Sequence, residues 1–248
     1  MPKARAAALK ALSLDNTLAE AHSALVNILV RFDLDFAGAG NEFRRALELN
    51  PTYAGARCRY AALLSNLGKF EASESEYRHA LELEPQSLVC NVGYGGMLFY
   101  ARRNDDAVGQ LRKTIELDDS FFLAHAVLAV VFQVTGKWAD SVQERARSAE
   151  LNGSEQDAAG MRDSFEKRGW IGFARYMTGE GRPVRTSSYD DARFYAELGE
   201  KDKAFAALNK SFEERHINLA GIKVDPLLDP LRDDPRFAEL LRKVTFPE

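Results

Sequence analysis

A short phrase of apolar and acidic residues returns at a nearly constant spacing along the first 153 residues of this 248-residue chain. Its five copies begin at positions 11, 46, 80, 114 and 148, so successive copies are 35, 34, 34 and 34 residues apart. A fixed period of this length is typical of a two-helix unit that stacks on the next copy of itself. The period therefore predicts an all-α array.

Other positions keep the same step of 34 residues. One position carries small residues and the position before it large apolar ones; the small residues are Ala61, Gly95 and Ala129, and the large ones Tyr60, Tyr94 and Leu128. A small residue lets the neighbouring helix approach closely, and bulky residues fill the groove so created. These columns resemble the tetratricopeptide repeat family over residues 4–153. The resemblance implies a right-handed superhelical solenoid of antiparallel helix pairs, with a C-terminal capping helix.

Glycines and prolines mark the ends of the expected helices. Gly68 and Gly136 end first helices of a pair, and Pro51 and Pro85 stop second helices. The one extra residue in the first interval falls near 32–35, where a turn can absorb it. We expect helix pairs at 17–48, 52–82, 86–117 and 120–151, preceded by a lone second helix at 4–14.

After residue 153 the pattern shortens and then returns. The tail carries Asp-Pro steps at 225, 229 and 234, and an aspartate before a proline is typical of a helix start. The tail is therefore predicted to be a cap over the last repeat. We expect a short pair at 154–168 and 170–178 with a turn at Gly169, a loop at 179–188, and a last pair at 188–199 and 201–215. One continuous solenoid is thus divided into regular repeats (1–153), a degenerate repeat with its loop (154–187), and a final pair with its cap (188–248).

The lone helix at 4–14 lacks the partner that the repeat would supply. One of its apolar sides is therefore expected to lie open. Either the chain is part of a longer protein or another chain covers that side, and the second alternative makes this helix a homodimer contact.

Composition excludes several classes of partner. The formal net charge is −4 and no run of five like charges occurs, which argues against nucleic-acid binding and against a polybasic membrane patch. No stretch approaches the roughly 18 apolar residues of a membrane span. Two cysteines make neither a disulfide framework nor a four-ligand zinc site. A cytoplasmic location is expected.

The chain contains histidine, cysteine and clustered glycines, but not in the arrangements that metal binding, catalysis or phosphate binding requires. His22 and His125 share one column of successive repeats, which keeps them apart, so a structural role is expected. The glycines at 93, 95 and 96 fall within a helix and do not open one, so they do not make a phosphate loop. Cys58 lacks an evident base. We predict no catalytic residue, metal ligand or cofactor, and no enzymatic activity.

In tetratricopeptide arrays the first helices line a concave surface on which partners dock. The resemblance therefore implies a groove for a protein or peptide ligand. The predicted groove residues are Asn27, Arg31, Cys58, Arg59, Ala62, Asn66, Val92, Phe99, Tyr100, Val130 and Gln133; Glu20, Ser23, Val30, Ser65, Val89, Gly96, Leu123, Ala126 and Val134 fall in the same columns.

The predicted groove changes character along its length. Its N-terminal half is polar with two arginines, whereas its C-terminal half is apolar and aromatic. Some family members hold a terminal carboxylate with lysine and asparagine, but Ser23 stands where the lysine would be. We expect an extended or helical peptide whose apolar side chains meet Phe99, Tyr100 and Val130, and whose acidic group pairs with Arg31 or Arg59. The alternative is that the chain's own C-terminal repeats cover the apolar half.

The order of elements also resembles a narrower group. Segments 35–46, 169–172, 195–205 and 225–237 are similar to the C-terminal repeat regions of bacterial signalling and transcriptional regulators. That resemblance implies a docking or sensory module of a larger protein. Two alternatives stay open: self-association through the N-terminal helix, and a small-ligand or enzyme pocket near 170–189, where Trp170, Phe173, Tyr176 and Tyr189 could gather.

Overall fold

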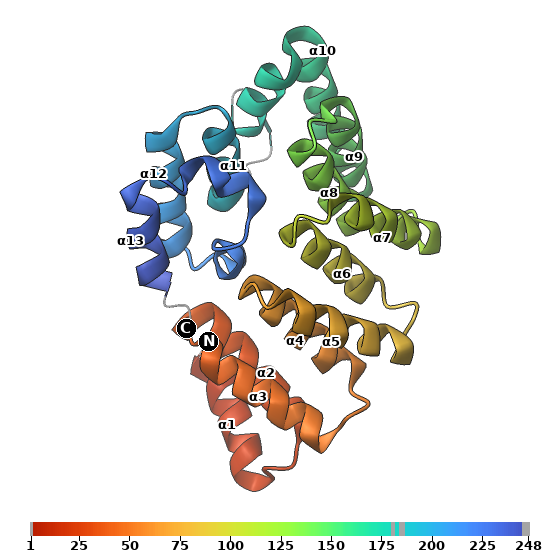
Figure 1. Cartoon of the computed structure of the whole chain (residues 1–248), viewed down its shortest axis with the longest axis vertical. Helices are drawn as coiled ribbons and strands as arrows, with labels where there is room; N and C mark the ends of the chain where they lie inside the picture. Colours follow the sequence, from red (N-terminus) through yellow and green to blue (C-terminus); the bar gives the residue numbers. More distant parts are fainter. Residues whose placement is uncertain (1, 180–181, 184–186, 245–248) are drawn as a thin grey trace.

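The computed structural model describes residues 2–179, 182–183 and 187–244, except the side chains of Pro2, Asn27 and Arg31. It is an all-α repeat solenoid, as the period predicts (Figure 1). The regular part comprises α1 (Pro2–Leu14), α2 (Ala19–Ile28), η1 (Leu29–Asp33), α3 (Phe36–Leu49), α4 (Ala54–Asn66), α5 (Phe70–Leu83), α6 (Leu88–Tyr100), α7 (Asn104–Leu117), α8 (Phe122–Val134) and α9 (Trp138–Leu151). It continues with α10 (Glu155–Met177), α11 (Ser188–Glu197), α12 (Lys201–Glu213), η2 (Ile217–Gly221), η3 (Pro226–Leu231) and α13 (Pro235–Val244).

The period of 34 residues appears directly in the backbone. Just after each first helix the backbone adopts a left-handed conformation, at Leu34, Gly68, Arg102 and Gly136, with φ of 54°, 76°, 64° and 71°. This conformation reverses the chain into the second helix. Glycine adopts it without strain, whereas leucine and arginine do so at a cost.

A second periodic feature ties each first helix to the next helix and to the turn before it. His125 contacts Glu144 Oε2 through Nδ1 at 2.6 Å and the carbonyl of Asp119 through Nε2 at 3.1 Å. Arg57 makes the equivalent pair of contacts, to Glu76 at 2.6 Å and to the carbonyl of Pro51 at 2.9 Å. The structural role predicted for His125 is therefore confirmed, and His22 makes the same pair, with Glu42 and the carbonyl of Asn16.

Two irregularities fall where the sequence places them. The extra residue of the first interval is accommodated by a π-helical turn, η1, which ends at Leu34. Farther along, α10 is broken at Gly169, whose φ of 63° and ψ of −159° lie in a region that only glycine occupies readily. The break converts one continuous helix into the short pair expected there.

The solenoid curves until its two ends meet (Figure 1). Val244, in the last turn of α13, is fully buried in one core with Val26 and Phe36 from the first full repeat. The tail was expected to cover only the last repeat, and this expectation is incomplete. Its residues Leu228, Leu231, Phe237 and Leu240 do pack on the last pair, while Val244 closes the ring against α2 and α3.

One of the three Asp-Pro steps does not begin a helix. Asp225 caps η3, where its side chain accepts a hydrogen bond from the Leu227 backbone at 3.0 Å, and Pro235 begins α13. Pro230, however, lies inside η3. The helix start expected at 229–230 is therefore wrong, because a 3₁₀ turn already started at Asp225 continues through that step.

Candidate functional site

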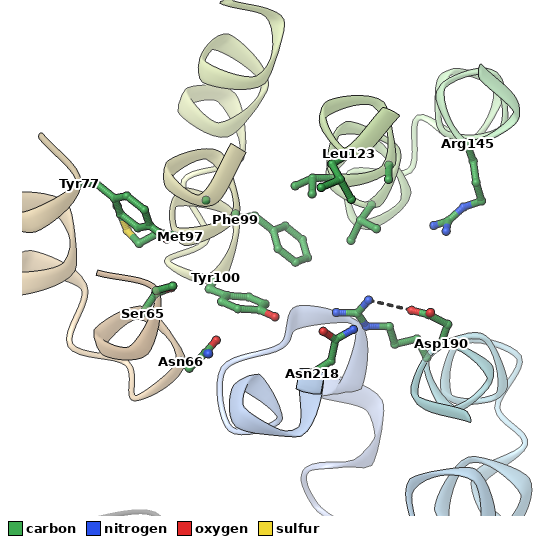
Figure 2. Close-up of a pocket in the computed structure, with 17 residues that line it drawn as sticks. Ser65, Asn66, Tyr77, Met97, Phe99, Tyr100, Leu123, Arg145, Asp190 and Asn218 are labelled. Carbon is green, nitrogen blue, oxygen red and sulfur yellow. Dashed lines mark hydrogen bonds and ion pairs between the residues drawn. The ribbon is translucent and has the colours of Figure 1, made fainter. Parts of the chain in front are cut away.

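The ring leaves a cavity of about 470 Å³ on its concave side. First helices α4, α6 and α8 bound one side, with Arg145 of α9 next to α8, and residues of α11 and η2 bound the other (Figure 2). The wall on the side of the first helices is apolar, formed by Met97, Phe99, Leu123, Val127 and Val130. Phe99 is 3% exposed and packs with Tyr100 at a ring-centroid distance of 5.6 Å.

Three polar side chains at this cavity lack hydrogen-bond partners among the described residues. Asn66 ends α4, Asn218 lies on η2, and Figure 2 shows both close to Tyr100. The side-chain amide of neither asparagine is bonded within the part of the chain that the structure describes. The hydroxyl of Ser65 is buried without a partner there. Buried polar groups are normally satisfied, so the buried Ser65 hydroxyl favours a site that receives another molecule. The amides of Asn66 and Asn218 are partly exposed and are therefore accessible to such a molecule.

The glycines of α6 differ in what surrounds them. A Cβ at Gly93 would lie 2.7 Å from the Tyr77 hydroxyl, and one at Gly95 would lie 2.7 Å from Leu111 Cγ. Close packing therefore accounts for both. Nothing lies within 4 Å of a Cβ at Gly96, which lines the cavity, so here the bare backbone faces open space.

The C-terminal side of the cavity contains a buried ion pair. Arg193 Nη2 lies 2.7 Å from Asp225 Oδ2, and the side chains are 12% and 0% exposed. Asp190 also pairs with Arg193, at 3.1 Å, as the dashed line in Figure 2 shows. Although burial opposes charge on the Asp190 carboxyl, Arg193 and the Ser187 hydroxyl outweigh it and lower its pKa. Arg193 is thus neutralised by its own neighbours.

Arg145 lines the same cavity with less compensation. Its Nη2 donates to the amide oxygen of Gln133 at 3.0 Å, and its guanidinium lies 5.3 Å from the ring centroid of Phe194. Its Nε is buried without a hydrogen bond among the described residues. Burial lowers the pKa of Arg145 to about 10, which shows that its surroundings disfavour the charge.

The structure brings five of the predicted groove residues to the cavity: Ala62, Asn66, Phe99, Tyr100 and Val130. Ser65, Gly96, Leu123 and Ala126, from the same columns, join them. The other predicted residues lie away from its lining. Arg59 bonds to Ser23 at 3.0 Å, Cys58 lies against Cys90, Val92 is buried in the core, and Gln133 links Arg145 to Glu197. The side chains of Asn27 and Arg31 lie outside the described residues.

Sequence reasoning missed four charged or amide side chains that complete the site, and also Tyr77, Gly93, Met97 and Val127 of its lining. Arg145 lies on a second helix, which the family pattern assigns to the outer wall, and Asp190, Arg193 and Asn218 follow the degenerate repeat. Closure of the ring brings Asp190, Arg193 and Asn218 to the concave face, beside Arg145. The alternative that the chain's own C-terminal part covers the apolar half holds only at its edge, where η2 lies against Tyr100: a Cβ at Gly221 would be 2.8 Å from the Tyr100 hydroxyl.

The pocket considered near 170–189 is not supported. Trp170, Phe173 and Tyr176 are packed into one buried core with Phe194, and Tyr189 is fully buried in the neighbouring core. These aromatic side chains fill the space between the short pair and α11. In the described part of the chain, no helix is long and apolar enough to cross a membrane, and no three His, Cys, Asp or Glu residues are grouped as metal ligands.

A family model described as Tetratricopeptide repeat matches residues 42–74. No curated protein matches the sequence. Among solved structures, the chain is similar to Pseudomonas aeruginosa pilF (17% identity, TM-score 0.55, covering 92% of this chain and 98% of that one). It is also similar to a chain of the APC/C hetero-tetramer Cut9-Hcn1 (14% identity, TM-score 0.60, covering 99% of this chain and 46% of that one). A third similar structure is the human IFIT1 dimer with PPP-AAAA (14% identity, TM-score 0.57, covering 98% of this chain and 67% of that one). At these identities the likeness shows the shared fold.

Proposed function

We propose that this chain is a protein-binding scaffold that holds a segment of a partner polypeptide in the cavity between its concave helices and η2. The observation that carries the proposal is the position of two amides, Asn66 and Asn218, which have no hydrogen-bond partner among the described residues and lie beside the apolar wall. A peptide backbone offers both N–H and C=O groups, and an asparagine amide can accept from the one and donate to the other. An apolar side chain of the same peptide would pack on Phe99 and Val130.

The open backbone at Gly96 supports the same proposal. A bound peptide approaches most closely where the site presents no side chain, and Gly96 is such a place in the lining of the cavity. The match of residues 42–74 to the tetratricopeptide repeat agrees with a binding role, and a chain of similar fold is part of the Cut9-Hcn1 hetero-tetramer.

In its cellular setting we propose the docking or sensory module of a larger bacterial regulatory protein, working in the cytoplasm without a cofactor and without catalysis. Similarity of segments 35–46, 169–172, 195–205 and 225–237 to such regulators supports this setting. The proposed ligand is a protein or peptide; neither nucleic acid nor membrane is expected to bind, in keeping with the absence of a run of five like charges.

Self-association through α1 is a second candidate, favoured by the exposed apolar residues around that helix. Leu9, Leu14 and Leu18 are 50%, 74% and 39% exposed, and a shallow apolar hollow lies between α1 and α2. Sedimentation analysis of the native chain and of Leu9→Glu/Leu14→Glu tests it. A mass that stays monomeric over a wide concentration range in both would remove this candidate.

The proposed peptide site is tested by placing a larger side chain inside the cavity. Random linear peptides displayed on phage with a free C-terminus are selected on the native chain, and the enriched sequences are synthesised. Gly96→Leu should abolish their binding, because its side chain enters the cavity without meeting another group within 4 Å of its Cβ. Gly109→Leu is the matched control, since Gly109 lies on α7 with equally open surroundings and outside the cavity. Failure to enrich any sequence, or equal binding by both variants, would refute the proposal.

A further inference from the structure

Arg145 and the two arginines that interact with it electrostatically, Arg193 and Arg182, differ in how they are neutralised. Arg182 is paired with Asp157 at 2.6 Å, and these side chains are only 7% and 3% exposed. Arg193 is paired with Asp225 at 2.7 Å. Arg145 has no carboxylate within ion-pair distance among residues 2–179, 182–183 and 187–244, and its contact with the Gln133 amide is neutral.

The acidic groups near Arg145 are engaged elsewhere. Asp190 accepts from the Ser187 hydroxyl at 2.7 Å and pairs with Arg193. Glu197 accepts from Gln133 at 2.8 Å, and burial raises the pKa of its carboxyl. Gln133 therefore separates Arg145 from Glu197 by bonding both of them. The guanidinium stacks on Phe194 and keeps a buried Nε–H without an acceptor in the described structure.

The guanidinium of Arg145 and the apolar wall line the same cavity. Together they define which chemical groups a ligand must carry. Figure 2 shows Arg145 extending toward the cavity from α9, across from Leu123 and Phe99. An uncompensated arginine in a partly desolvated site binds a carboxylate through charge-assisted, often bidentate hydrogen bonds. The apolar wall meanwhile requires a nonpolar side chain close to that carboxylate.

Resting on the proposed peptide-binding function, we infer that the partner segment carries a carboxylate next to an apolar anchor, and that Arg145 selects it. The apolar anchor packs on Phe99, Leu123 and Val130, and the carboxylate pairs with the guanidinium of Arg145. The carboxylate belongs to the partner peptide, as an Asp or Glu side chain or as its C-terminus. This assigns specificity to a second-helix residue outside the concave columns.

The same phage-selected peptides test the inference. Enriched sequences should place Asp, Glu or the free C-terminus within a residue or two of an aromatic or aliphatic residue. Arg145→Gln should weaken their binding about 10- to 100-fold, as expected for loss of a desolvated charge pair. Arg147→Gln, an exposed substitution on the same helix, should change binding less than about 2-fold.

A second experiment changes the peptide instead of the protein, so its result does not depend on how the protein variants fold. Changing the peptide's Asp or Glu to Asn or Gln, or amidating its C-terminus, identifies which carboxylate is bound. That change should cost the same factor on the native chain and almost nothing on Arg145→Gln. The unfolding temperature of Arg145→Gln is measured in parallel, because the substitution also removes the bond to Gln133 and the contact with Phe194.

The outcomes separate the two proposals. Peptides that require Gly96 yet bind equally to native chain and Arg145→Gln would overturn the inference and leave the peptide site in place. If removing the peptide's carboxylate weakened binding equally for the native chain and for Arg145→Gln, the inference would also be overturned. Absence of any selected peptide would refute the binding function itself, and the inference with it.

Discussion

Arg102 and Asp229 are 127 residues apart in the sequence, yet the Arg102 guanidinium donates to both carboxylate oxygens of Asp229 at 2.8 and 2.9 Å. Arg102 also donates to the carbonyl of Val224 at 3.2 Å. It occupies the left-handed position that Gly68 and Gly136 fill in neighbouring repeats. One residue thus departs from the repeat's preferred glycine and joins α6 to the tail that covers the cavity.

Replacing Arg102 with glycine should loosen the tail without unfolding the ring. The ion pair is more than 40% exposed on both sides, so its loss costs less than about 1 kcal/mol, and glycine relieves the left-handed backbone. Hydrogen–deuterium exchange should speed up in 217–231 while the unfolding temperature stays nearly constant. Arg112→Gln, exposed on α7, is the control, and unchanged exchange in 217–231 would show that Arg102 does not hold the tail.

Asp225→Asn should be strongly destabilising. Asp225 is fully buried and accepts from Arg193, from the Tyr189 hydroxyl at 2.9 Å and from the Leu227 backbone. Asparagine removes the fully buried partner of Arg193 and leaves the more exposed Asp190 to compensate its charge, so the cost should approach the roughly 3–5 kcal/mol of a broken buried pair. Urea denaturation followed by circular dichroism measures the loss. Asp233→Asn, on the exposed surface, should change the midpoint little; a similar small effect for Asp225 would contradict the assigned role.

Gly169→Ala and Gly109→Ala should shift stability in opposite directions. No atom lies within 4 Å of a Cβ at either glycine, so packing does not distinguish them. Gly169 has φ 63° and ψ −159°, and a side chain there costs about 1–3 kcal/mol. Gly109 is helical, and alanine there is favoured by up to about 1 kcal/mol. Thermal unfolding of the two variants checks the sign, and a stabilising Gly169→Ala would show that the break in α10 is not required.

Glu197→Gln should stabilise the fold at pH 7 and have little effect at pH 4. Burial raises the pKa of the Glu197 carboxyl in the folded chain. A raised pKa contributes stability below the unfolded-state value of about 4.3, and this contribution is lost as pH rises through the folded value. Glutamine removes that penalty and can still accept from Gln133. Urea midpoints across this range should diverge toward neutral pH; a constant difference would argue against a buried charge.

Cys58 should be alkylated before Cys90. The contact with Cys90 lowers the pKa of the half-buried Cys58 thiol, and the same contact together with burial raises the pKa of Cys90. The thiolate is the reacting form, so iodoacetamide at neutral pH should modify Cys58 first, as mass spectrometry of the digest would show. Cys58→Ser should remove the early reaction, and equal rates for both cysteines in the native chain would contradict this order.

Much of the fold is local and could be predicted from the sequence alone. The turn residues, the columns of small and large side chains and the 34-residue step determine helices α1 to α9, because each unit contacts mainly its neighbours. The repeated positions of the first helices likewise predicted that Asn66, Phe99 and Val130 lie on the concave face. Even the extra residue before Leu34 and the break at Gly169 were visible as departures from the period.

Tertiary structure alone decided how far the solenoid curves and where it closes. Small rotations between successive repeats add up over the whole array, so the meeting of Val244 with Val26 depends on every interface between them. That closure carries Asn218 and Arg193 to the concave side, opposite Phe99 and beside Arg145. No single segment encodes this juxtaposition, because the cavity is made by residues whose proximity exists only after the ring has formed.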